Sequence, residues 1–179
     1  NILCAISALD GSVYSICALP TVLSEKDLKE LLQQWCFDTV VTDTDIPDIF
    51  TASGINCLRI NQAISSSTIS ENNNSFETRW LVPTSGTTSS PKLVVHTFDS
   101  LGKTALQNPS VSSKLPIWGL FYEVIRFAGY QVWFQSLING HLLVLTNATA
   151  SIEERVAFSA ANGVSHISAT PTLWRKILM

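Results

Sequence analysis

The strongest constraint on the fold is a helix, strand and helix at the end of the chain, each with its own start or stop signal. Residues 151–163 carry an S-x-x-E capping box at Ser151 and end in Asn-Gly, a typical helix stop. The apolar segment 164–169 is predicted to be a strand, and the next helix starts with Thr170 as N-cap and a proline at its first position. A strand between two helices is typical of α/β proteins with a parallel sheet.

The first sixty residues repeat this alternation. The predicted elements are a short buried helix closed by Asp10-Gly11, a strand at 12–19, a helix capped by Ser24, and strands at 38–43 and 55–60. The second helix carries one apolar stripe of residues at i, i+3, i+4 and i+7, which are Leu28, Leu31, Leu32 and Trp35. We therefore predict a layered α/β/α architecture with a mostly parallel sheet.

A change in composition divides the chain. Residues 61–78 are rich in Ser, Asn, Thr and Glu, which is typical of a flexible surface connection. The segment after it, RWLVPT, is a predicted strand; KLVVHT is predicted to be the second strand of a hairpin before a helix near 98–106. We predict a first, partial α/β subdomain at 1–78, and a truncated second one at 79–179 that opens with the loop between these strands.

Composition excludes some classes of function. A formal net charge of −3 and no Lys/Arg cluster argue against nucleic acid as a partner. The apolar region 115–145 is interrupted by charged and polar residues, so it lacks the run of ~20 apolar residues that a membrane span needs. The four cysteines have no C-x-x-C spacing, and we predict reduced, mostly buried thiols of an intracellular protein.

The loop PTSGTTSSPK, at 83–92, contains the chemistry that a phosphate group needs. Hydroxyl side chains supply hydrogen-bond donors, Gly86 lets the backbone approach closely, and the ammonium of Lys92 neutralises an anion. Gly86 and Lys92 have the separation seen in a Walker-type loop, but Pro91 replaces its second glycine and Leu93 the hydroxyl that binds magnesium. A Walker-type nucleotidase is therefore disfavoured, and a plain Ser/Thr turn stays as an alternative.

The segment TSGTTSSPK resembles the T-S-G-[ST]-T-G-x-P-K signature of the adenylate-forming superfamily, which includes acyl-CoA synthetases, adenylation domains of peptide synthetases and luciferases. It departs at Ser89, where the family usually has glycine, and this puts tight phosphate binding in doubt. The segments VSHISATPTLWRKILM, LPIWGLFYEVIRFAGYQVWFQSLINGHLLVL and LPTVLSEKDLKELLQQWCFDTVVTD are similar to family segments in the same order. The resemblance covers nearly the whole chain.

The resemblance implies an incomplete N-terminal domain of an AMP-forming acid–thiol ligase. Such an enzyme uses ATP and Mg²⁺ to convert a small carboxylic acid into an acyl-adenylate, and passes the acyl group to CoA or to the phosphopantetheine of an acyl carrier protein. It also implies a cytoplasmic enzyme without a transmembrane segment. The family's magnesium-binding glutamate, ribose-binding aspartate and catalytic lysine domain fall outside this chain, so we expect the fragment alone to be inactive.

Residue roles follow from the resemblance position by position. Lys92 is the catalytic cation, and the residues that bind the ATP phosphates are Thr84, Ser85, Gly86, Thr87 and Thr88; no metal ligand is assigned. The aromatic residues expected to line the acyl pocket are Trp118, Phe121 and Tyr122.

Each further candidate also has a structural interpretation. The three aromatic residues fit a hydrophobic core as well as a pocket. Glu123 and Arg126 have the spacing of a simple ion pair, and His96 and His166 fit structural, hydrogen-bonded histidines. Two alternative functions also stay open: an amino-acid adenylation domain, and a non-catalytic homologue that binds nucleotide.

Overall fold

The computed structural model describes residues 2–20, 23–59, 77–84, 92–107, 114–147 and 149–179. In this part of the chain the elements follow in the order α1 (Ile2–Leu9), β1 (Ser15–Cys17), α2 (Glu25–Gln34), β2 (Thr39–Thr42), α3 (Asp48–Ala52), β3 (Asn56–Arg59), β4 (Arg79–Thr84), β5 (Lys92–His96), α4 (Phe98–Gln107), β6 (Ile117–Leu120), α5 (Phe127–Ile138), β7 (Leu142–Leu145), α6 (Ile152–Ala161), β8 (His166–Ile167) and α7 (Pro171–Leu178).

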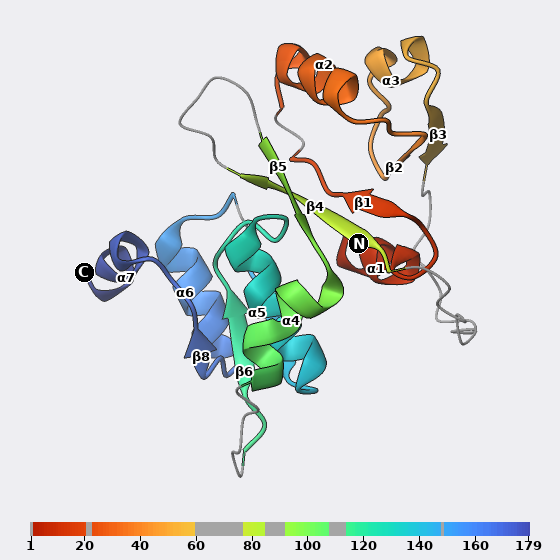
Figure 1. Ribbon diagram of the computed structural model, residues 1–179. Coiled ribbons are helices and arrows are strands. Elements are labelled where there is room, and N and C mark those ends of the chain that lie inside the picture. Colours follow the sequence, from red (N-terminus) through yellow and green to blue (C-terminus); the bar gives the residue numbers. More distant parts are fainter. Residues whose placement is uncertain (1, 21–22, 60–76, 85–91, 108–113, 148) are drawn as a thin grey trace.

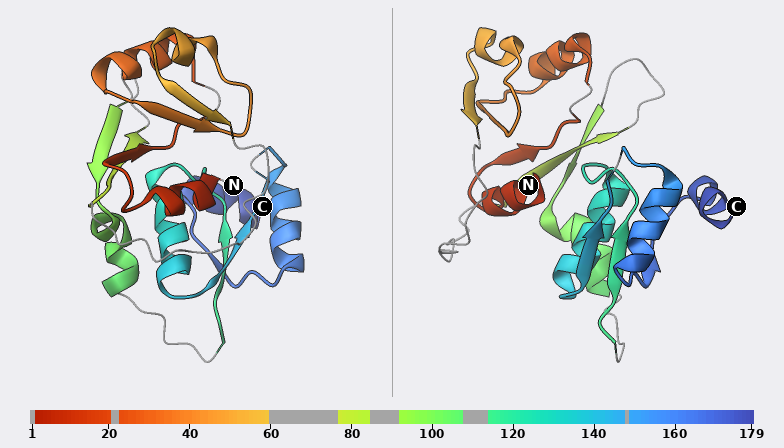
Figure 2. Two further views of the ribbon diagram at one scale, coloured as in Figure 1. Left: turned by 90° about the vertical axis from the view of Figure 1, so that its right-hand side faces the viewer. Right: turned by 180° about the vertical axis from the view of Figure 1, so that it is seen from behind.

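The described strands form three small sheets, with the orders β1-β4-β5, β2-β3 and β7-β6-β8. All neighbouring strands are parallel except β4 and β5, which form an antiparallel hairpin. The α/β class and the mostly parallel pairing predicted from the sequence are therefore confirmed. Figures 1 and 2 show α2, α3, β2 and β3 gathered as one unit at an end of the molecule.

The first sheet joins residues that are far apart in the sequence. β1 pairs with β4 in a parallel register that places Ser15 opposite Arg79. Side chains from this sheet pack against α1, α4 and α5 in one core, whose buried members are Ile6, Ile16, Ala18, Trp80, Val82, Leu101, Ile125, Tyr130, Trp133 and Phe134. The strand pairing crosses the predicted boundary at residue 78, and the division into two subdomains stays a prediction.

The turn between α1 and β1 is tied to β4 by side-chain hydrogen bonds. The buried hydroxyl of Thr78 accepts a hydrogen bond from the Gly11 amide (2.8 Å) and donates one to the Val13 carbonyl (2.7 Å). The indole N–H of Trp80 donates to the carboxylate of Asp10 at 2.9 Å. These bonds satisfy polar groups next to the core, which would otherwise cost free energy on burial.

The third sheet has the β-α-β connections that the sequence predicts. Figure 1 and the right panel of Figure 2 show β6 between α5 on one side and α6 on the other. The capping box of α6 is present, with both the Ser151 hydroxyl and the Glu154 carboxylate engaged. Thr170 caps α7 through its side chain, and Gly163 takes a positive φ of 69° at the end of α6, as expected for a helix stop.

Four local features differ from the predictions. The helix α3 was not predicted, and α2 ends at Gln34, so that Trp35 is its C-cap and not part of the helix. The first helix was predicted to be buried, but Ile6 is its one buried residue and half of its residues are exposed. The cysteines are free, as predicted, but Cys4 and Cys36 are exposed.

None of the described helices is both long enough and apolar enough to cross a membrane.

Candidate functional site

The candidate phosphate site is carried by the β4–β5 hairpin. Short runs of consecutive apolar residues make both strands, and the antiparallel register places Thr84 opposite Lys92 at one end and Trp80 opposite His96 at the other. The Thr84 hydroxyl donates to the Lys92 carbonyl at 3.1 Å. Thr84 and Lys92 therefore close the hairpin at the point where the two strands meet the loop.

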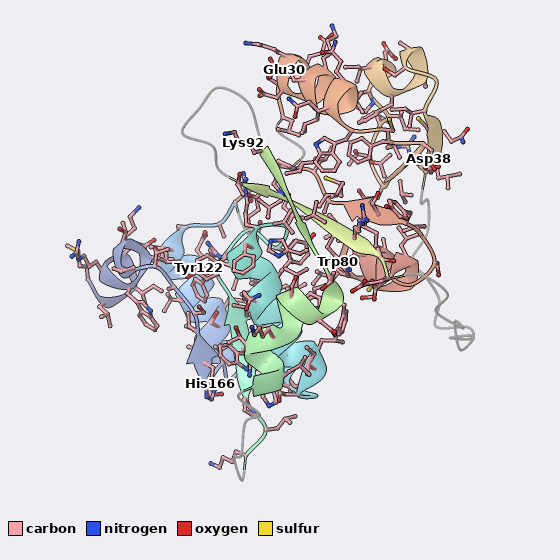
Figure 3. All side chains as sticks on the ribbon, in the orientation of Figure 1. Glu30, Asp38, Trp80, Lys92, Tyr122 and His166 are labelled. Atoms are coloured by element: carbon pink, nitrogen blue, oxygen red, sulfur yellow. The ribbon has the colours of Figure 1, made fainter. Side chains whose placement is uncertain are left out.

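The Lys92 side chain is available to bind an anion at this end of the hairpin. Its side chain is exposed, and within the described ranges no carboxylate lies at ion-pair distance from its ammonium. Figure 3 shows Lys92 at the end of β5 that the loop enters. Thr84 is less available than the sequence predicts, because its single hydroxyl hydrogen is used within the hairpin.

Four of the predicted phosphate-binding residues, Ser85, Gly86, Thr87 and Thr88, lie outside the described residues, as does Ser89. Their roles stay predictions.

Two of the three candidate acyl-pocket residues, Phe121 and Tyr122, follow β6, whose carboxyl end is where α/β sheets bind ligands. Phe121 is buried with 4% of its surface exposed, and the Arg155 guanidinium lies over its ring at 4.8 Å. Tyr122 is half-buried. Of these two, Phe121 is thus packed inside the domain, while Tyr122 has surface left for a ligand.

Trp118 lies apart from these two residues. It is in the amino-terminal half of β6, where its indole N–H donates to Nδ1 of His141 at 3.2 Å. Its ring centroid is 5.2 Å from that of His166, its register partner on β8. Figure 3 shows Tyr122 and His166 well separated along the third sheet. The structure therefore does not bring Trp118 together with Tyr122.

The predicted ion pair between Glu123 and Arg126 is present, with 2.9 Å between Oε2 and Nε. The two residues form a turn, since the Arg126 amide donates to the Glu123 carbonyl at 3.1 Å, and Arg126 is the N-cap of α5. Both side chains are partly exposed, so the pair contributes little to stability. Its effect is to shape the turn that follows Tyr122.

Arg155 is a site residue that the sequence analysis missed. Its Nε donates to the Thr146 hydroxyl at 2.9 Å, and that hydroxyl donates to the Leu120 carbonyl at 2.9 Å. Burial lowers the pKa of Arg155. Leu120 ends β6 and Thr146 follows β7, so Arg155 holds the carboxyl ends of both strands together. The partners of Arg155 come from other elements, and no residue spacing in the sequence predicts such contacts.

The described residues fit an anion better than a metal ion. The exposed ammonium of Lys92 is a suitable partner for ATP phosphates. No group of three or more His, Cys, Asp or Glu side chains that would suit a metal occurs in the described part of the chain.

No protein-family model matches the sequence, and no curated protein is significantly similar to it. Solved structures match the fold. One is o-succinylbenzoate CoA synthetase (MenE) from Bacillus subtilis in complex with AMP, with a TM-score of 0.69 and 21% identity over 92% of this chain and 44% of that one. Another is the N-terminal subdomain of NpsA from Klebsiella oxytoca in complex with 3-hydroxybenzoyl-AMSN, with a TM-score of 0.64 and 14% identity over 89% and 42%.

A third is E. coli MenE with an analogue of OSB-AMS, with a TM-score of 0.61 and 18% identity over 89% of this chain and 34% of that one. The chain spans less than half the length of these structures. It therefore has the fold of part of an adenylate-forming enzyme, as the loop motif predicts. At these identities the likeness concerns the fold.

Proposed function

We propose that this chain is part of an ATP-dependent, AMP-forming ligase that converts a carboxylic acid into an acyl-adenylate and passes the acyl group to a thiol. The observation that carries the proposal is the β4–β5 hairpin. Its two facing end residues, Thr84 and Lys92, are the first and last residues of the TSGTTSSPK motif. The fold supports it, because a B. subtilis MenE structure with the same fold holds an acyl-adenylate, and another holds ATP and a magnesium ion.

ATP would supply the adenylyl group: a carboxylate oxygen would attack its α-phosphorus, and the bond from that phosphorus to pyrophosphate, the leaving group, would break. In our proposal the loop's hydroxyl and amide groups donate hydrogen bonds to the β- and γ-phosphates, and Lys92 Nζ offsets the charge that develops on pyrophosphate. Donors held in place before the reaction need no reorganisation as that charge appears. Tyr122 lies on the acid's side of the site in this proposal, at the carboxyl end of β6.

The acid and the acceptor are open parts of the proposal. CoA is the acceptor that we favour, because the MenE structures of the same fold are named CoA synthetases. An acyl carrier protein and the selection of an amino acid are the alternatives. A non-catalytic homologue is the third, and Ser89 in place of the family's glycine is the feature that favours it.

Exchange of labelled pyrophosphate into ATP, in the presence of a panel of carboxylic acids, tests the proposal on the full-length protein. We expect acid-dependent exchange, and a loss of roughly ten- to a thousandfold in Lys92→Ala or Thr87→Ala, the scale of one preorganised donor. Lys103→Ala is the matched control, because it removes an exposed lysine from α4.

Exchange that no acid supports would favour the non-catalytic homologue. If Lys92→Ala left the exchange rate unchanged, the loop would be a plain Ser/Thr turn that does not bind the phosphates. Exchange confined to amino acids would identify an adenylation domain.

A further inference from the structure

His96 joins three elements at the end of the β4–β5 hairpin. It is the last residue of β5, four positions after Lys92. Its Nδ1 lies 3.3 Å from the hydroxyl of Ser100 on α4. The centroid of its ring is 5.3 Å from that of Phe127, the first residue of α5, and the two planes meet at 35°.

The hydrogen bonds around Ser100 favour one tautomer of His96. The Ser100 hydroxyl accepts from the Thr97 amide at 2.9 Å and donates its single hydrogen to the Thr97 carbonyl at 3.0 Å. The Thr97 carbonyl is the nearer of the two acceptors for this hydrogen, and with the hydrogen placed there the contact to His96 is completed by Nδ1–H of His96 as the donor. Burial lowers the pKa of His96 and so favours the neutral ring near pH 7.

Phe127 lies in a tightly packed corner, residues 122–129, where the chain turns from β6 into α5. A Cβ atom at Gly129 would lie 2.3 Å from the Glu123 carbonyl oxygen and 2.8 Å from the Val124 Cα, so the first turn of α5 is packed directly against the turn before it. The ion pair between Glu123 and Arg126 holds the same turn. Any side chain that fixes Phe127 thereby fixes the segment that starts at Tyr122.

Phe127 itself is half exposed, at 48%, so the core does not hold its ring. The His96 ring is the aromatic group that the structure shows against it. The contact therefore links the strand that carries Lys92 to the corner that carries Tyr122, across two different sheets.

We propose that His96 is a positioning residue: its ring holds the β4–β5 hairpin in register with the turn after β6, and so aligns the phosphate side of the site with the acid side. The inference rests on the function proposed above. It adds a residue that binds neither reactant and acts through Lys92 and Phe127. A misplacement of about 1 Å between reacting groups costs up to about a hundredfold in rate. Loss of a contact that aligns these groups should therefore lower the rate measurably.

The chain contains a matched control. His166 makes the same two kinds of contact, with its Nδ1 2.8 Å from the Ser165 hydroxyl and its ring 5.2 Å from that of Trp118. It lies beside the amino-terminal half of β6, away from the hairpin. His166→Ala therefore removes similar interactions without touching the proposed alignment.

The test compares His96→Ala, His96→Phe, His96→Asn and His166→Ala in the full-length protein. For His96→Ala we expect kcat of ATP–pyrophosphate exchange to fall roughly tenfold or more while the KM for MgATP changes by less than about threefold, because the hairpin still binds ATP but is misaligned. His96→Phe, which keeps a ring against Phe127, should recover most of kcat. His96→Asn, which keeps only an N–H near Ser100, should not.

Hydrogen–deuterium exchange gives a readout that needs no activity. Amides in the first turn of α5 should exchange faster in His96→Ala than in the wild type, and His166→Ala should leave them unchanged. An active wild type with equal kcat in His96→Ala, or an Asn variant that recovers as well as Phe, would overturn this inference alone. A wild type that shows no exchange with any acid would overturn the proposed function and this inference with it.

Discussion

Burial changes the reactivity of Cys17. Burial on β1 raises the pKa of its thiol to about 12, whereas Cys36 is exposed. Since the thiolate is the form that reacts, we expect iodoacetamide near pH 8 to label Cys36 at least about a hundredfold faster than Cys17. Mass spectrometry of the peptides over time measures both rates. Denaturant should bring the rates together, and equal rates in the folded protein would contradict the predicted burial.

Local patterns predict individual residues well where their partners are close in sequence. The caps Ser24, Ser151 and Thr170 were predicted from spacing, because a cap bonds to an amide three residues away. Arg155 and Phe127 were not, because their partners come from other elements. Residues of this second kind join different elements of the fold.

Among the elements, α5 depends most on close backbone contact. Gly129 lies in its first turn, and the nearest atoms to an added Cβ belong to the backbone of Glu123 and Val124. Gly129→Ala should lower the free energy of unfolding by about 1–3 kcal/mol, although alanine favours helix by about 1 kcal/mol, because the turn has to move. Urea unfolding measures the loss.

Gly102→Ala on α4 is the control for this prediction. An added Cβ there would lie 2.7 Å from Cδ1 of Ile138, the end of a flexible side chain that can turn away. It should cost clearly less than Gly129→Ala. Equal losses would show that close approach to the backbone is not what fixes α5.

The elements themselves were largely predictable, and the exceptions have physical reasons. Long segments with caps and a helical or strand period, such as α2, α6 and the β4–β5 hairpin, were predicted in type and order. The five-residue helix α3 is too short to show a 3.6-residue period, so its sequence gave no signal. Trp35 continues the apolar period of α2 but takes an extended conformation as its C-cap.

Over the whole chain, the sequence predicts the α/β class but not the division of the strands into three sheets. The pairing of β1 with β4 joins Ser15 to Arg79 across the Ser/Asn-rich connection, and no local pattern encodes a contact at such separation. The same holds for the proposed site: the motif predicts a phosphate side, whereas the contacts of His96 with Ser100 and Phe127, which we propose to link it to the acid side, depend on how β5, α4 and α5 pack.

Trp80 connects the two predicted subdomains through its side chain. Its ring packs against Tyr130, Trp133 and Phe134 of α5 at centroid distances of 5.6, 6.0 and 5.5 Å, and its indole N–H bonds to Asp10. It therefore joins the start of the chain to the second predicted subdomain. Trp80→Ala should lower the free energy of unfolding by about 3–5 kcal/mol.

Trp80→Phe keeps a ring in the core and loses the hydrogen bond to Asp10, so it should cost about 1 kcal/mol beyond the smaller ring's lost contacts. Urea unfolding followed by circular dichroism, and by proteolysis mapped to residues 1–78 and 79–179, measures both variants. In the wild type the two segments should unfold together, because their side chains share one core. Separate midpoints for the two segments would instead make residue 78 a boundary between independent folding units.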